Sequence, residues 1–155
     1  MKKTVIAMAI TSALASPAFA DSFVNGGFED GTTNGWDVSN SAYRAGVNNT
    51  ALTPAWVYAN DTSSMRSKVI NAGTVDPNVG AAFGTTVYSG QHSMRVEDTV
   101  SGGYASAIQQ TVVNYTDPSI YFAWKAVLEG AHDAATAATM KIVLRDVTDG
   151  VDLIT

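Results

Sequence analysis

The sequence contains no cysteine, four prolines and few basic residues, with nine lysines and arginines against fourteen aspartates and glutamates in 155 residues. Without cysteine the chain can form no disulfide and carry no lipidated thiol. The formal net charge of −5 argues against binding to nucleic acid or to an anionic membrane surface. No apolar run is long enough to span a bilayer, so we expect no membrane insertion. The length allows one domain.

The first twenty residues have the three parts of a secretory signal peptide. Lys2 and Lys3 supply the basic part, residues 5–14 form a short apolar stretch, and Ala18-Phe19-Ala20 is a cleavage site of the small-x-small type. We therefore expect a secreted protein, located outside the cell, at its surface or in the periplasm. Cleavage after Ala20 leaves residues 21–155 as a single mature domain.

Apolar and polar residues alternate with a period of two from residue 21 onward, and helical patterns are scarce. This pattern predicts an all-β fold, an antiparallel β-sandwich in which Trp36 and Trp124 are core. Asp149-Gly150 predicts a hairpin turn between the last two strands, and the alanine-rich segment 129–140 is predicted to be a loop rather than a helix. The predicted strands are residues 35–39, 42–47, 55–59, 66–71, 93–97, 104–113, 120–128, 140–147 and 151–154.

Three motifs follow one another along the mature chain. They are Asn25-Gly26-Gly27-Phe28-Glu29 with Gly35-Trp36 after it, Ser89-Gly90-Gln91-His92-Ser93-Met94-Arg95, and a strand that ends in Gln110-Thr111-Val112. Together they resemble the carbohydrate-binding-module jelly rolls of the galactose-binding-domain-like superfamily. The whole pattern also resembles exported bacterial proteins of the PEP-CTERM type. The resemblance implies a jelly-roll sandwich and a sugar-binding or surface-associated role.

The resemblance extends to about residue 147, and the closing strands of those jelly rolls have no counterpart before Thr155. We therefore expect a truncated chain or a fragment, with a compact complete variant as the alternative. A jelly roll needs about eight strands. An incomplete one leaves strand 151–154 at an unpaired edge, and such an edge predicts self-association.

The Glu29 carboxylate is the first candidate for a functional group. In related binding modules the glutamate of this motif helps to coordinate a structural Ca²⁺ ion. The resemblance therefore implies a calcium site made of Glu29 and main-chain oxygens near Gly90 and His92, since hard oxygen ligands suit Ca²⁺. The alternative is that Glu29 caps the turn at Asp30-Gly31.

Trp56, Tyr58, Asn60 and Asp61 supply the groups that sugar recognition needs within six positions. A flat aromatic face contacts the C–H surface of a pyranose, and amides or carboxylates bind its hydroxyls. On a strand at 55–59, Trp56 and Tyr58 would alternate onto one side and form a platform at the mouth of the sandwich. The alternative is that both rings are core.

Two weaker platform candidates occur elsewhere in the sequence. Tyr43 stands beside Arg44, and Tyr104 follows Gly102-Gly103. Tyr43 has a charged neighbour that could bind a sugar hydroxyl, and Tyr104 follows two glycines. An aromatic ring beside such residues is a candidate for stacking against a sugar.

Motifs for catalysis are absent from the sequence, which has no nucleophile elbow, zinc-protease motif, phosphate loop or cysteine nucleophile. Glu97 and Asp98 are adjacent, so on a strand they would point to opposite faces and could not act as an acid–base pair. We expect a non-enzymatic module that binds a polysaccharide or a cell-surface glycan. The alternatives are a structural or adhesive matrix component and a glycoside hydrolase, which needs two carboxylates across a cleft.

Overall fold

The computed structural model describes residues 23–113, 115–130 and 133–155, so the predicted signal peptide lies outside the described residues. In the described part, the helical residues are those of α1 (Pro54–Ala59) and of a 3₁₀ turn, η1 (Ala81–Phe83). The predicted all-β, antiparallel fold is confirmed. No helix within these ranges is long and apolar enough to cross a membrane.

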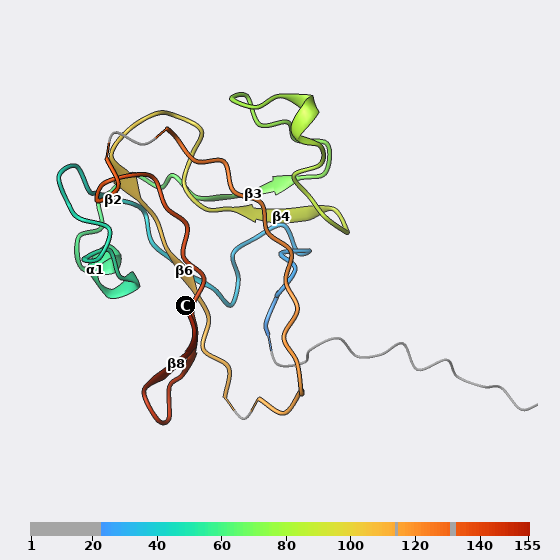
Figure 1. Ribbon diagram of the computed structural model, residues 1–155. Coiled ribbons are helices and arrows are strands. Elements are labelled where there is room, and N and C mark those ends of the chain that lie inside the picture. The colour runs from blue at the N-terminus through green and yellow to red at the C-terminus, as the bar shows by residue number, and fades with distance from the viewer. Residues whose placement is uncertain (1–22, 114, 131–132) are drawn as a thin grey trace, which may run out of the picture.

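The strands of the described residues form four antiparallel ladders of two strands each (Figure 1). The first three ladders join segments that are far apart in the sequence, whereas the last is a local hairpin. The merging of these ladders into a jelly-roll sandwich stays a prediction. The pairs are β1 (Asp37–Val38) with β6 (Ile108–Gln109), β2 (Ala42–Tyr43) with β5 (Tyr104–Ala105), β3 (Lys68–Asn71) with β4 (His92–Arg95), and β7 (Leu144–Asp146) with β8 (Val151–Ile154).

The β1–β6 and β2–β5 ladders belong to one interrupted ribbon. Val38 lies opposite Ile108 and Ala42 opposite Ala105, so the first segment has one more residue than the second between these pairs. This extra residue is a β-bulge. At the bulge the backbone N–H of Ser39 donates to the carbonyl of Ala107 (2.9 Å), and the Ala107 N–H donates back to the Ser39 hydroxyl (2.7 Å). The ribbon therefore stays hydrogen-bonded where its register changes.

The strand predicted at residues 55–59 is wrong, because these residues belong to the helix α1. The Thr53 hydroxyl accepts a hydrogen bond from the Trp56 N–H (3.1 Å) and caps the helix, and Pro54 occupies its first turn. The backbone N–H of Asn60 closes the other end by donating to the Trp56 carbonyl (3.1 Å). Thr53-Pro54 is a helix-start pattern, and it outweighed the strand preference of the aromatic residues that follow.

The core lies within residues 23–113. All hydrophobic side chains that are buried in the described residues come from this region, and they are Phe28, Ala42, Leu52, Val57, Ile70 and Val87. Trp36, which was predicted to be core, is half-buried and packs beside this core, with its ring centroid 5.1 Å from that of Phe28. The prediction that Trp124 is core is wrong, because 61% of this residue is exposed.

The predicted strand at residues 120–128 has no partner strand within the part of the chain that the structure describes. No backbone–backbone hydrogen bond among the described residues involves 116–130, and Figure 1 draws this segment as a long trace without an arrow. Lys125 anchors it by donating to the carbonyls of Phe83 (2.9 Å) and Thr85 (2.7 Å). Alternation along a sequence predicts which side chains share a face, but a strand also needs a neighbouring backbone.

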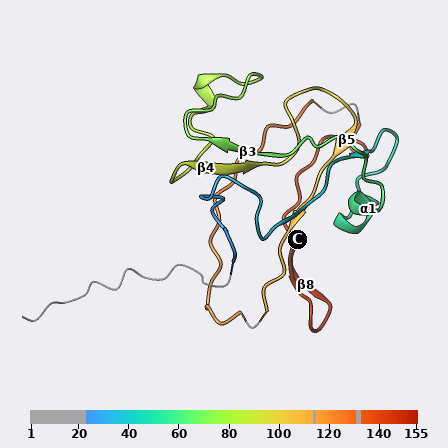
Figure 2. The same ribbon diagram turned by 180° about the vertical axis from the view of Figure 1, so that it is seen from behind.

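The hairpin predicted around Asp149-Gly150 is confirmed by the pairing of β7 with β8. Gly150 has φ +69°, a conformation that glycine adopts without strain. Arg145 and Asp152 form an ion pair across the hairpin. Both views of the molecule place the hairpin at the end opposite the β3–β4 ladder (Figures 1 and 2). The 129–140 segment forms turns and no helix in the residues that the structure describes there, as predicted.

Candidate functional site

The four residues predicted as a sugar site do not form a platform on a strand. Trp56 and Tyr58 lie on α1, and the Tyr58 hydroxyl donates to the Asp37 carbonyl (2.9 Å). Burial raises the pKa of Tyr58 far above its usual range, and the nearby carboxylates of Asp37 and Asp61 add to the effect. Tyr58 therefore fastens the helix to β1.

The polar members of that predicted site are also engaged in hydrogen bonds within the fold. The Asn60 amide donates to the carbonyl of Trp56 (2.8 Å), and the Asp61 carboxylate accepts a hydrogen bond from the backbone N–H of Asn40 (3.0 Å). The Trp56 ring is half-buried. Sugar binding by these four residues stays a prediction, without the alternating geometry that motivated it.

The two weaker aromatic candidates come together in the structure. The register of β2 and β5 places Tyr43 opposite Tyr104, with ring centroids 5.3 Å apart in an edge-to-face arrangement. Tyr43 is 60% exposed. The guanidinium carbon of Arg66 lies 3.6 Å from the centroid of the Tyr104 ring, which is a cation–π contact. Tyr43 is therefore the accessible ring of a pair whose other ring is covered.

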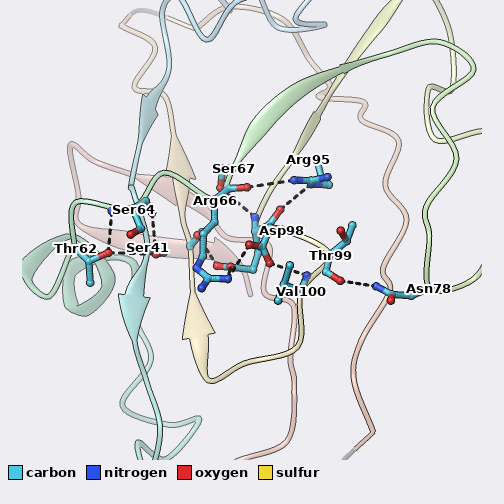
Figure 3. Close-up of polar contacts among 12 residues, drawn as sticks. Ser41, Thr62, Ser64, Arg66, Ser67, Asn78, Arg95, Asp98, Thr99 and Val100 are labelled. Carbon is cyan, nitrogen blue, oxygen red and sulfur yellow. Dashed lines mark hydrogen bonds and ion pairs between the residues drawn. The ribbon is translucent and has the colours of Figure 1, made fainter.

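Arg66 also contacts two carboxylates, and Figure 3 shows its guanidinium beside one of them, that of Asp98. Its Nη1 lies 2.7 Å from Oδ2 of Asp98 and 3.6 Å from Oε1 of Glu97. The hydroxyl of Ser106 donates to the other oxygen of Glu97 (2.7 Å). We refer to Tyr43, Tyr104, Arg66, Glu97 and Asp98 as the tyrosine–arginine cluster.

The prediction that Glu97 and Asp98 point to opposite faces is wrong, because both side chains approach Arg66. Alternation requires extended backbone, whereas β4 ends at Arg95 and Glu97 has φ +71°. The Glu97 backbone is held in this conformation on both sides, because its N–H donates to the Ser67 hydroxyl (3.0 Å) and its carbonyl accepts from Arg95 Nε (2.9 Å).

Backbone strain and unused hydrogen-bonding atoms coincide in this cluster. A non-glycine residue held in the left-handed region costs about 1–3 kcal/mol and is often found at functional sites. Nε of Arg66 and Oε1 of Glu97 are buried and have no hydrogen-bond partner. The 3.6 Å contact between Arg66 and Glu97 is an ion pair too long to be a hydrogen bond. The cluster therefore retains polar atoms that its own residues do not satisfy.

The three residues predicted to surround a metal ion lie together. The Glu29 carboxylate accepts hydrogen bonds from the backbone N–H groups of Gln91 (2.8 Å) and His92 (3.2 Å), and these bonds lower the pKa of the Glu29 carboxyl. Gly90 has φ +77°, and a Cβ atom there would overlap the same carboxylate. The contact ties the loop that precedes β1 to the start of β4.

The alternative that Glu29 caps the Asp30-Gly31 turn is wrong, because Asp30 itself organises this turn. One carboxylate oxygen of Asp30 accepts hydrogen bonds from the N–H (2.8 Å) and the hydroxyl (2.8 Å) of Thr32 and from the Asn25 amide (2.7 Å). The hydrogen bonds from Thr32 lower the pKa of Asp30. Glu29 is left to reach the β4 backbone.

Ca²⁺ takes about six to eight oxygen ligands, and Glu29 is the one carboxylate of the predicted set. N–H groups face the carboxylate, and the described ranges hold no group of three or more His, Cys, Asp and Glu residues that could bind a metal ion. Calcium binding at Glu29, Gly90 and His92 stays a prediction. A rise in melting temperature in millimolar Ca²⁺ that Glu29→Gln removes would establish the site, and equal melting in Ca²⁺ and in chelator would exclude it.

Comparison with known proteins gives no match to a family model, to a curated protein or to a solved structure.

Proposed function

We propose that this chain is an exported, non-enzymatic carbohydrate-binding module that uses the tyrosine–arginine cluster as its sugar site. The observation that carries the proposal is the 60% exposed Tyr43 ring, which lies edge-to-face with Tyr104. An exposed ring of this kind offers the flat face on which a pyranose ring stacks.

The charged residues behind the rings supply groups that suit sugar hydroxyls. A hydroxyl can donate to a carboxylate of Glu97 or Asp98 and accept from the guanidinium of Arg66. Asp98 and Arg66 are partly accessible, with side chains 22% and 18% exposed. The two carboxylates share one guanidinium instead of facing each other across a cleft, and this arrangement favours binding over hydrolysis.

The test is retention of the purified chain on a panel of insoluble polysaccharides and on a glycan array. Tyr43→Ala should weaken retention at least tenfold, whereas Tyr43→Trp should preserve it because a larger flat face remains. Tyr88→Ala is the matched control, because Tyr88 is 84% exposed and belongs to no contact of the cluster. Equal retention of the Tyr43→Ala and Tyr88→Ala variants would refute the proposed site. All variants should keep the unfolding transition of the parent chain.

A second function, as a structural or adhesive component of extracellular matrix, is favoured by a different observation. The unpaired 116–130 segment exposes Tyr121, Phe122 and Trp124 to solvent. Apolar side chains on an unpaired backbone favour association with another chain. Concentration-dependent assembly together with an empty glycan array would support this function over sugar binding.

A further inference from the structure

A second candidate site lies on the other side of β2 from Tyr43. Ala42 and Arg44 are buried while Tyr43 between them is exposed, so Arg44 points away from the tyrosine–arginine cluster. An open hollow of about 230 Å³ lies on the Arg44 side. It is lined by Arg44, Ala45, Gly46, Gly103 and Thr136.

Arg44 is a buried cation without an anionic partner among the described residues. It is 8% exposed. Its guanidinium donates to the side-chain oxygen of Asn49 (2.9 Å) and to the carbonyls of Thr136 (2.8 Å) and Ala137 (3.4 Å). All three acceptors are neutral, and the salt bridges in the described part of the chain involve Arg66 and Arg145 instead. A buried charge is costly unless it is paired, so Arg44 favours an anion beside it.

The guanidinium has donors left for such an anion. An arginine side chain carries five N–H groups, and the contacts of Arg44 use three of them. No nitrogen of Arg44 is among the polar atoms that are sealed from solvent without a partner, in contrast to Nε of Arg66. Nε of Arg44, which makes no hydrogen bond with the described residues, therefore stays accessible to a group that enters the hollow.

The surroundings of the hollow add a second cation. The Lys141 ammonium donates to the carbonyls of Asn49 (2.8 Å) and Leu52 (3.1 Å), in the same loop that Arg44 holds through its guanidinium. The nearby Asp133 carboxylate accepts hydrogen bonds from the backbone and hydroxyl of Thr136, so it is engaged within its own turn. Arg44 and Lys141 thus both contact the loop that contains Asn49, in a chain whose net charge is −5.

The hollow is open and small. An added Cβ atom at Gly46 would have nothing within 4 Å, so this rim is unobstructed. Pockets for drug-sized ligands measure about 300–1,000 Å³, so the volume of about 230 Å³ suits a single small group. We propose that the hollow beside Arg44 binds the carboxylate of a small ligand, and this site is independent of the sugar site proposed at Tyr43.

The experiment titrates the full chain with sodium glucuronate, sodium acetate and glucose by calorimetry and by NMR chemical shifts. Glucuronate should bind saturably, with an affinity that falls as salt is added, and glucose should bind at least tenfold more weakly. Acetate binding as tight as glucuronate binding would assign recognition to the carboxylate alone. Weaker binding of acetate than of glucuronate would show that the sugar ring as well as the carboxylate is recognised. Both results support the proposal. Absence of binding by both carboxylates, or equal binding of glucose and glucuronate, would overturn it.

Variants on the rim keep the proposal testable, since removing Arg44 also removes contacts that hold the fold. Ala45 is exposed and lines the hollow, so Ala45→Glu places a competing carboxylate beside Arg44, and Ala45→Gln is its uncharged match. Glucuronate affinity should fall at least tenfold in Ala45→Glu and persist in Ala45→Gln. Equal affinity in these two variants would overturn the proposal. Ala45→Glu should leave retention on polysaccharides unchanged, because Ala45 belongs to the hollow and not to the tyrosine–arginine cluster, so failure of the sugar site and failure of the hollow are distinguishable.

Discussion

The regions on either side of residue 114 differ in how much strand pairing and burial accompany their alternating sequence pattern. Residues 23–113 hold three of the four ladders of the described chain and all of its buried hydrophobic side chains. Residues 115–130 and 133–155 have an equally clear apolar alternation, yet they form one local hairpin and a long unpaired segment. Alternation of apolar and polar residues shows which side chains of a strand could be buried together. Whether they are buried depends on a second strand or surface that packs against them, and the alternation does not provide one.

The largest expected effect compares the same substitution in the two regions. Phe28 is buried against Trp36 in the first region, and Phe122 is exposed in the second. Phe28→Ala should lower the free energy of unfolding by about 3–5 kcal/mol, whereas Phe122→Ala should change it by less than about 0.5 kcal/mol. Urea unfolding at low protein concentration measures both values. A similar loss in both variants would show that the second region is packed too.

An intermediate effect is expected on association, which the exposed side chains of 116–130 favour. Replacing Phe122 and Trp124 by serine should raise the dissociation constant for self-association at least tenfold, which is about 1.4 kcal/mol. Light scattering across a concentration series measures this. Tyr88→Ser, at an exposed aromatic residue of the first region, is the control. If Tyr88→Ser weakens self-association as much as the serine replacements at Phe122 and Trp124, the two regions do not differ in this respect.

The smallest effect concerns acid stability, which we expect to depend on Glu29 in the first region. Hydrogen bonds from the β4 backbone lower the pKa of Glu29 in the folded state below the ordinary value of 4.5. The unfolded state therefore binds the proton at higher pH. The resulting stabilisation is fully present above the unfolded pKa and is lost as the pH falls through the folded pKa.

Glu29→Gln should therefore reduce the loss of stability in acid, at pH values from about 5 downward. Urea unfolding at a series of pH values measures the change. Glu129→Gln, in the second region, is the control for removal of a carboxylate, because Glu129 accepts a side-chain hydrogen bond from Ser101 and, among the described residues, none from a backbone N–H group. An unchanged pH dependence in Glu29→Gln would mean that the contact with β4 is absent in solution.

Local chemistry explains the parts of the fold that the sequence could predict. The Asp149-Gly150 turn determines the β7–β8 hairpin within a few residues, and strand 151–154 matches β8 in both bounds. The helix α1 could have been predicted in the same way from Thr53-Pro54. It was missed because the aromatic residues that follow have a strand preference, and a good N-cap overrides a preference of that size.

Long-range register and an unusual backbone conformation explain what the sequence could not predict at the candidate site. Tyr43 and Tyr104 each stood out as platform candidates, but only the β2–β5 register shows that they form one pair. The convergence of Glu97 and Asp98 on Arg66 depends on a positive φ at Glu97, and a glutamate gives no sequence indication of that conformation.

Hydrogen exchange of backbone amides in the monomeric chain tests the difference between the two regions most directly. Amides that form ladder hydrogen bonds exchange through opening of the structure, whereas amides without a partner exchange freely. Amides of β3 and β4 should therefore be protected, and those of 116–130 should exchange at the rates of an unfolded peptide. Protection of 116–130 in a monomer comparable to that of β3 and β4 would contradict the account, because it would show that this segment has a partner within the chain.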